Sequence, residues 1–200
     1  MQPLRSPELS ALRSEVATRL GLDLGPTDAG FEGECRDYLS SLRWPGGVEC
    51  PRCSESARLL WLASRSKWHC YGCRYQFSVT AGTLFHSSHL PVWKWFVAVH
   101  LMLSTPDGVS ANELGRTLGG SYKTAWFAAH RIRAAMRGHG SELLRSLVDA
   151  EVGNSGKYRP AYVAERRWRA RHRANPHVLR DTIRALLEGE GISYERLVAA

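Results

Sequence analysis

The chain has 200 residues, 44% of them hydrophobic, which is enough for one full domain or for two or three small ones. Its 27 Lys and Arg against 19 Asp and Glu give a formal net charge of +8, which favours a polyanionic partner, nucleic acid before an anionic membrane surface. No stretch reaches the roughly 18 consecutive apolar residues of a membrane span, and no signal-peptide pattern follows the N-terminus. We therefore expect a cytoplasmic protein with reduced thiols and no membrane partner.

The first predicted elements are two helices. PELSALRSEVATRL is a short amphipathic pattern that ends at LGPTDAG. In ECRDYLSSLRW, Cys35, Tyr38, Leu39 and Leu42 fall on one helix face. Cys35 is therefore expected to be a buried thiol that packs as a small hydrophobe, with a fifth metal ligand or a reactive thiol as the alternatives.

Four of the five cysteines form two pairs. CPRC supplies Cys50 and Cys53, CYGC supplies Cys70 and Cys73, and 16 residues separate the pairs. This is a zinc-site spacing, and four thiolates complete a tetrahedral structural site. The cofactor expected here is zinc; four buried thiols are the alternative.

Short apolar and aromatic segments surround the cysteine pairs. RLLWLA, SKWH and YQFSV alternate in part and are bounded by turn residues, so each predicts a strand. Gly72, inside the second pair, is expected to supply the tight backbone turn. The sequence therefore predicts a small zinc-bound β structure.

A helical section follows. PVWKWFVAVHLML predicts one helix, and Ser110 with Glu113 gives the start signal of a second, short helix. That helix ends at Gly119-Gly120, and Ser121 opens a third, SYKTAWFAAHRIRAAMR. Two helices joined by a glycine-containing turn are typical of a helix-turn-helix. A plain three-helix bundle with a solvated basic face is the alternative.

In a helix-turn-helix the N-terminal residues of the second helix meet base edges. Basic residues further along that helix are more suited to phosphate contact, whereas Trp126, Phe127 and Ile132 are expected to be buried. The expected DNA-binding residues are Ser121, Tyr122, Lys123 and Thr124 for the bases, and Arg131, Arg133 and Arg137 for the phosphates.

The last section is polar and helical. ERRWRARHR carries five arginines around Trp168, which fits either contact with DNA phosphates or a solvated helix surface. PHVLRDTIRALLEGEGISYERLVAA predicts a short amphipathic helix that docks on the body or on a partner. Its apolar positions are Val178, Ile183, Leu186 and Leu187. The acidic residues expected at exposed helix positions are Glu165, Asp181, Glu188, Glu190 and Glu195.

These elements predict a mainly α fold with a small β zinc ribbon, a three-helix helix-turn-helix unit and a helical C-terminal tail. The expected sections are an N-terminal helical extension (1–29), a helix plus zinc ribbon (30–89), the helix-turn-helix (90–138) and a basic helical tail (139–200). His86 and His89 lack further ligands nearby in the sequence, so no ion is assigned to them.

Three stretches together resemble a known family. FEGECRDYLSSLRWPGGVECPRC, WHCYGCRYQFSVTAGTLFHSSHLPVWKWF and GVSANELGRTLGGSYKTAWFAAHRIRAAM occur in the order seen in insertion-sequence (ISXO2-like) transposases, which begin with a zinc ribbon and a helix-turn-helix. The resemblance implies that this half binds transposon ends. In the family a DDE nuclease domain of RNase H fold then cuts and joins DNA with divalent metal.

The chain departs from the family after Gly140, because the remaining 60 residues show no strand patterns for the nuclease sheet. Asp149 and Glu151 lie where the resemblance would put the first catalytic acid, but two surface acids are the favoured interpretation. No catalytic residue is therefore assigned.

Three functions are compatible with these patterns. The preferred one is a non-catalytic, transposase-derived protein that binds double-stranded DNA, as a regulator or a truncated transposase. The second is the DNA-binding part of a transposase whose DDE domain is supplied elsewhere, which would make the assembly an enzyme. The third is a zinc ribbon that binds protein. Whether the chain forms a homo-oligomer is left open by the sequence.

Overall fold

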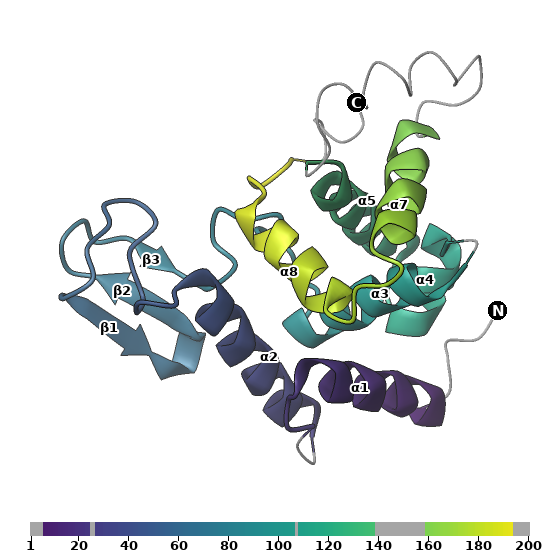
Figure 1. Ribbon diagram of the computed structural model, residues 1–200. Coiled ribbons are helices and arrows are strands. Elements are labelled where there is room, and N and C mark those ends of the chain that lie inside the picture. Colours follow the sequence, from purple (N-terminus) through teal and green to yellow (C-terminus); the bar gives the residue numbers. More distant parts are fainter. Residues whose placement is uncertain (1–5, 25–26, 107, 139–158, 194–200) are drawn as a thin grey trace.

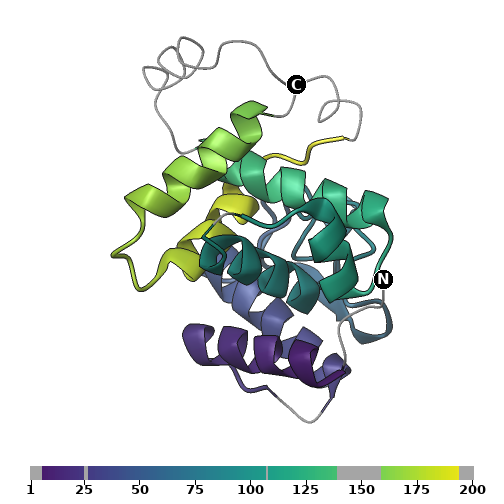
Figure 2. The ribbon, with the colours of Figure 1, turned by 90° about the vertical axis from the view of Figure 1, so that its right-hand side faces the viewer.

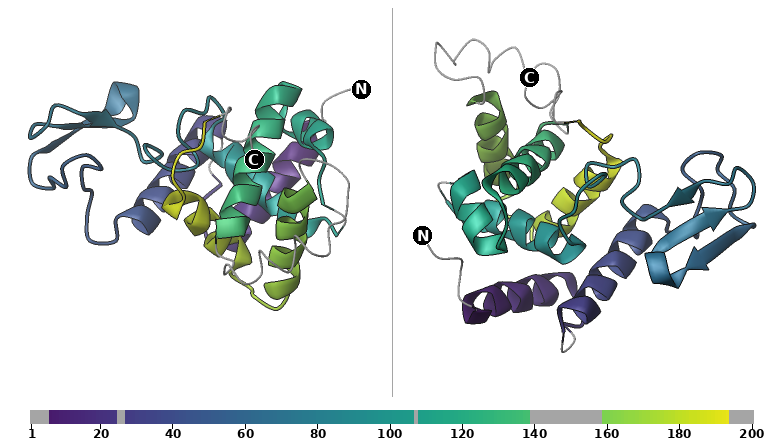
Figure 3. Two further views of the ribbon diagram at one scale, coloured as in Figure 1. Left: turned by 90° about the horizontal axis from the view of Figure 1, so that it is seen from above. Right: turned by 180° about the vertical axis from the view of Figure 1, so that it is seen from behind.

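A small β ribbon projects from one side of a helical body (Figure 1). The computed structural model describes residues 6–24, 27–106, 108–138 and 159–193. Helix α2 runs from the body to the ribbon, and the ribbon stays at the far end of α2 when the molecule is seen from above or from behind (Figure 3). The predicted fold class, mainly α with a small β ribbon, is confirmed.

The body begins with α1 (Ser6–Leu20) and α2 (Asp28–Arg43). Thr27 caps α2 by accepting a hydrogen bond from the Gly30 amide at 3.1 Å. As predicted, Cys35 and Leu39 are buried on one face of α2, together with Phe31. This face packs on the following helix and fixes where the ribbon leaves the body.

The ribbon is a three-stranded antiparallel sheet in the order β1-β2-β3, with β1 at Leu59–Leu62, β2 at Lys67–Cys70 and β3 at Gln76–Phe77. A single 3-10 turn, η1 (Ala63–Arg65), joins β1 to β2. Its small core contains Phe77, against which Trp44 packs edge to face with ring centroids 6.0 Å apart. Because the ribbon buries few apolar residues, its core alone gives little stability, and the ribbon depends on another source of stability.

The predicted helix-turn-helix is present as α3 (Val92–Ser104), α4 (Ala111–Leu118) and α5 (Tyr122–Gly138). Ser110 caps α4 by accepting from the Glu113 amide at 3.2 Å. Gly119 ends α4 with φ +65°, a left-handed conformation that glycine adopts without strain. Figure 2 shows α3, α4 and α5 gathered on one side of the body, with α1 below them.

The C-terminal section contains α7 (Arg159–Arg171) and α8 (Val178–Glu188), and both join the hydrophobic core of the body. Leu179, Ile183 and Leu186 of α8 are buried, so the amphipathic helix docks on the body. Trp168 is buried too, and its Nε1 donates to Thr182 Oγ1 at 3.0 Å. Helices α7 and α8 are therefore part of the helical framework.

Several expectations about burial are wrong. Glu165, expected at an exposed position, is 1% exposed, whereas Glu188 and Glu190 are exposed as predicted. Trp126 and Phe127 are only half-buried, although Ile132 is fully buried. Asp149, Glu151 and Glu195 lie outside the described residues. In the part of the chain that the structure describes, no helix has both the length and the apolarity needed to cross a membrane.

Candidate metal centre and nucleic-acid interface

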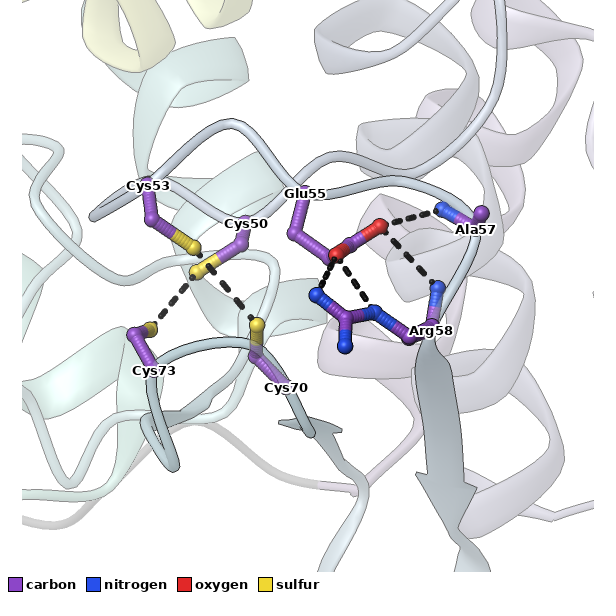
Figure 4. Close-up of polar contacts among 7 residues, drawn as sticks. All are labelled: Cys50, Cys53, Glu55, Ala57, Arg58, Cys70 and Cys73. Carbon is purple, nitrogen blue, oxygen red and sulfur yellow. Dashed lines mark hydrogen bonds and ion pairs between the residues drawn. The ribbon is translucent and has the colours of Figure 1, made fainter.

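The four paired cysteines converge on one point at the end of the ribbon (Figure 4). The Sγ atoms of Cys50 and Cys73 are 3.6 Å apart, as are those of Cys53 and Cys70, and all four lie within 4.8 Å of one another. Ligands at 2.3 Å from a tetrahedral zinc ion would be about 3.8 Å apart. The arrangement therefore suits a four-coordinate metal site.

The two cysteine pairs sit on matching backbone turns. The Cys50 amide donates to the Glu55 carbonyl and the Cys70 amide to the Tyr75 carbonyl, both at 2.9 Å. The residue after each pair takes a left-handed conformation, with φ +57° at Ser54 and +59° at Arg74. Each turn thus presents two thiols to the same point.

Gly72 lies in the tight turn of the second cysteine pair, as predicted, but its own φ is not positive. The positive φ of the second turn is at Arg74, two residues further on. A Cβ at Gly72 would lie 3.3 Å from Glu55 Oε2 and 3.5 Å from Cys70 Sγ. A larger residue at position 72 would therefore crowd the Glu55 carboxylate, a contact that the sequence alone does not reveal.

Glu55 is a structural residue of the site that sequence reasoning missed. Its Oε1 accepts from the backbone amides of Ala57 and Arg58 at 3.0 and 3.2 Å, and its Oε2 forms an ion pair with the Arg58 guanidinium at 2.8 Å (Figure 4). The hydrogen bond from the Arg58 side chain is the main cause that lowers the pKa of Glu55. In the sequence, this pattern is visible as an acidic residue whose side chain can accept hydrogen bonds from the backbone amides two and three residues later.

The pKa of one thiol of the site, Cys50, and the pKa of the remaining thiol, Cys35, shift in opposite directions, whereas the pKa of Cys53 is raised to about 12. Burial opposes ionisation of Cys50, but hydrogen bonds from the Arg52 and Cys53 amides and from Cys73 lower its pKa to about 7. Burial raises the pKa of the Cys35 thiol, and the nearby Glu32 carboxylate adds to this effect. Cys35 lies in the core of the body, so it is a buried thiol as predicted, and the thiolate chemistry a metal requires is at the ribbon.

The first turn of α5 is exposed at all four expected base-reading positions, Ser121 to Thr124. Ser121 Oγ accepts from the Thr124 amide at 3.1 Å and lies 2.9 Å from Thr124 Oγ1, so these two hydroxyls organise the start of the helix. Tyr122 is 56% exposed.

Two of the three expected phosphate contacts lie inside the protein. Arg131 is 2% exposed, and its guanidinium donates to the His86 carbonyl at 2.5 Å and to the Ile192 carbonyl at 3.0 Å. Arg133 is fully buried and forms an ion pair with Glu165. We therefore remove both from the candidate DNA interface and keep Arg137, which is exposed.

A signal for Arg133 was present in the sequence. Ala129, Arg133 and Met136 are spaced i, i+4 and i+7, so they share one helix face, and Ala129 and Met136 are buried. An arginine on an apolar stripe needs an acid from another element. Glu165 of α7 supplies this acid, but nothing in the sequence of α5 points to α7 as the source.

Comparison with known proteins agrees with this geometry. Residues 30–76 match the transposase zinc-ribbon domain of the IS1595 type, so this part of the chain is similar to a transposase zinc ribbon. The match covers nearly all of α2, strands β1 and β2, the first residue of β3 and all four cysteines.

One relative is described as an uncharacterized protein in transposable element ISH50 of Halobacterium salinarum, and it is 28% identical over 107 residues. The alignment covers 52% of this chain and 36% of that protein, so the chain spans about a third of the relative's length. No solved structure matches. The chain is thus similar to a transposase zinc ribbon over residues 30–76 and to a protein of a transposable element over about half of its length.

Proposed function

We propose that this chain is a zinc-stabilised, transposase-derived protein that binds double-stranded DNA through the first turn of α5. The observation that carries the proposal is the combination, in one chain, of a transposase zinc ribbon with clustered thiols and a second helix-turn-helix helix whose N-terminal turn is exposed. The net charge of +8 agrees with a polyanionic partner.

Zinc has a structural role in this proposal. Cys50, Cys53, Cys70 and Cys73 would be its ligands, and four protein ligands leave no open position for a water or substrate. The ion would supply stability that the small ribbon core lacks, because binding free energy at such a site is folding free energy.

The DNA contact divides into two kinds. Lys123, with Ser121, Tyr122 and Thr124 beside it, is suited to base edges in the major groove. Arg137 lies at the other end of α5, where an exposed guanidinium would contact phosphate.

No DNA cleavage is assigned to this chain. Within the described residues, the only group of three or more metal-ligand side chains found close together is the four cysteines, and their thiolates suit zinc rather than the magnesium of a nuclease site. The second candidate is the DNA-binding part of a transposase with its nuclease domain supplied elsewhere. It is supported by the alignment to only 36% of a protein from a transposable element.

The test begins with selection of bound duplexes from a random DNA library by the purified, zinc-containing protein. We expect an enriched sequence, affinity for it well above that for a scrambled duplex, and a fall in affinity with rising salt. An absence of duplex binding would reject the proposal and favour the protein-interaction alternative. Strand transfer on the selected duplex with magnesium or manganese would reject only the statement that the chain has no DNA-cleaving activity.

A further inference from the structure

The ribbon sheet has an inner and an outer face, which the strand register defines. Residues directly opposite each other on neighbouring strands share a face. Trp68 pairs with Phe77 and with Trp61, so these three share the inner face, where Phe77 is buried in the ribbon core and Trp61 is 46% exposed. His69 pairs with Leu60 on one side and with Gln76 on the other, so these three side chains share the outer face.

The outer face exposes apolar and aromatic side chains to solvent. Leu60 is 44% exposed and Tyr71 is 58% exposed, and the Tyr71 ring meets the His69 ring edge to face with centroids 5.0 Å apart. His69 Nδ1 is buried and has no hydrogen-bond partner. Side chains of this kind on a small domain indicate a contact surface.

Charge on the same face has one sign. Lys67 is two residues from His69 on β2 and therefore lies on the outer face, and Arg65 donates to Gln76 Oε1 at 3.4 Å. Both are exposed. The sequence from residue 59 to residue 77 contains no Asp or Glu, so no carboxylate of the sheet neutralises them.

Arg58 differs from these two cations. Although its side chain is exposed, it is paired with Glu55 at 2.8 Å and helps to hold the first cysteine turn. The available charge of the ribbon sheet is therefore concentrated on the outer face, around Tyr71 and Leu60.

We propose that the outer face of the ribbon, which carries Arg65 and Lys67 from one end of β2 and Tyr71 from the other, is a second DNA-contacting surface that binds the same duplex as α5. This inference rests on the proposed function. Lys and Arg would neutralise phosphates, and Tyr71 would lie against sugar or base with its hydroxyl free to donate. Positive charge alone complements a polyanion, which favours DNA over a protein partner for this face.

The position of the ribbon fits this assignment. It projects from the body at the far end of α2, separate from the helix-turn-helix (Figure 3). Two separate surfaces, one on the ribbon and one on α5, would contact a longer DNA site than one helix does. Binding of one surface to the duplex would raise the effective concentration of DNA at the other. The target should therefore contain two contacted segments.

The test compares two double variants with equal charge loss. Arg65→Ala with Lys67→Ala changes the outer face, and Arg19→Ala with Arg184→Ala removes two exposed arginines from α1 and α8. The probe is the duplex selected with the full-length, zinc-containing protein. Zinc content and melting temperature should match the unmodified protein in both variants, because all four side chains are exposed.

We expect the outer-face variant to lose about tenfold or more in affinity and to flatten the log-log salt slope by about two units, roughly 0.9 for each phosphate contact. The control variant should change both much less. Tyr71→Ala should weaken binding without changing the salt slope, since it carries no charge. A hydroxyl-radical footprint should lose one of two protected segments in the outer-face variant and keep both in the control.

The outcomes separate this inference from the proposed function. If the outer-face variant and the control have equal affinity and footprints while Lys123→Ala still impairs binding, the inference is wrong and the proposed function stands. If the unmodified protein binds no duplex, the proposed function fails first. If the outer-face variant binds DNA normally but loses a protein partner, the face is a protein-binding surface and the inference is rejected.

Discussion

Arg133 Nε lies 2.7 Å from Glu165 Oε2, and both side chains are completely enclosed, at 0% and 1% exposure. The pair joins α5 to α7 in the middle of the body. Arg133 also donates to the Val109 carbonyl at 3.1 Å, and its guanidinium lies 4.0 Å from the centre of the Tyr162 ring. The segment between α3 and α4 is thereby tied to both helices.

Glu165 extends this network to the start of the segment. Its Oε1 is 3.7 Å from Arg169, which in turn donates to the Thr105 carbonyl at the end of α3. Residue 108 is a glycine with φ +82°, and a Cβ there would lie 3.1 Å from Glu165 Oε1. The tail helix α7 thus holds the connection between the first two helices of the helix-turn-helix.

The first prediction concerns this buried pair. Glu165→Leu leaves the Arg133 charge buried without its carboxylate, which should lower the free energy of unfolding by about 3–5 kcal/mol. Arg133→Met combined with Glu165→Leu removes both charges and should cost much less. Urea denaturation at pH 7 measures both.

The control for the pair is Glu188→Leu, at an exposed position on α8. It should change the unfolding free energy by no more than about 0.5 kcal/mol. A Glu165→Leu protein as stable as this control would mean that the pair contributes nothing to the body.

The second prediction concerns pH. His130 is 5% exposed and stacks on Trp126 with ring centroids 4.2 Å apart. Burial, and secondarily the positive charge of Arg133, lowers its pKa from 6.5 to about 4. As pH falls below about 6.5 the unfolded chain takes up a proton at His130 and the folded chain does not, so stability falls until about pH 4, by about 3 kcal/mol.

The measurement is the unfolding free energy of the protein and of His130→Gln between pH 7 and pH 4. In the variant, the decrease of the unfolding free energy with falling pH should be smaller by about 1.4 kcal/mol per pH unit. His100, whose pKa is also lowered by burial, keeps part of the pH dependence in both proteins. An unchanged slope in His130→Gln would contradict the assignment.

Local signals were sufficient for the elements of this fold. The start of α4 follows from Ser110 and its end from Gly119, since both act on the backbone within four residues. The cysteine pairs likewise gave the position of the thiol cluster, because Cys-x-x-Cys places two ligands on one turn.

Burial of Arg131 was not predictable in the same way. Whether Arg131 is exposed depends on the His86 and Ile192 carbonyls, which are 45 and 61 residues away in the sequence. The guanidinium of an arginine at the edge of an apolar stripe either extends to solvent or, where hydrogen-bond acceptors are present, lies inside the protein. The sequence of α5 does not specify that partner.

The third prediction concerns the metal. Cys50→Ser should lose stoichiometric zinc and unfold the ribbon, since three thiolates no longer close the site. Removal of metal by a chelator at neutral pH should have the same effect. Zinc content by atomic absorption and the melting temperature test this.

Cys35→Ser is the matched control because the same replacement is made outside the cluster. It should keep one zinc per chain, yet lower stability by about 1–3 kcal/mol through a buried hydroxyl without an assured partner. Equal zinc content in Cys50→Ser and the unmodified protein would show that the thiol cluster is not the metal site.

The last prediction concerns the two ends of α5. Lys123→Ala, on the first turn, should cost about 1–3 kcal/mol at the selected duplex and relax the preference at one or two base pairs. Arg137→Ala, at the far end, should weaken selected and scrambled duplexes alike and reduce the salt slope by about one unit. Arg184→Ala, an exposed arginine on α8, is the control for loss of one positive charge. Salt titrations on both duplexes distinguish the three variants. If Lys123→Ala and Arg137→Ala both behave as Arg184→Ala does, α5 does not contact DNA, and the helical body is a scaffold for the ribbon.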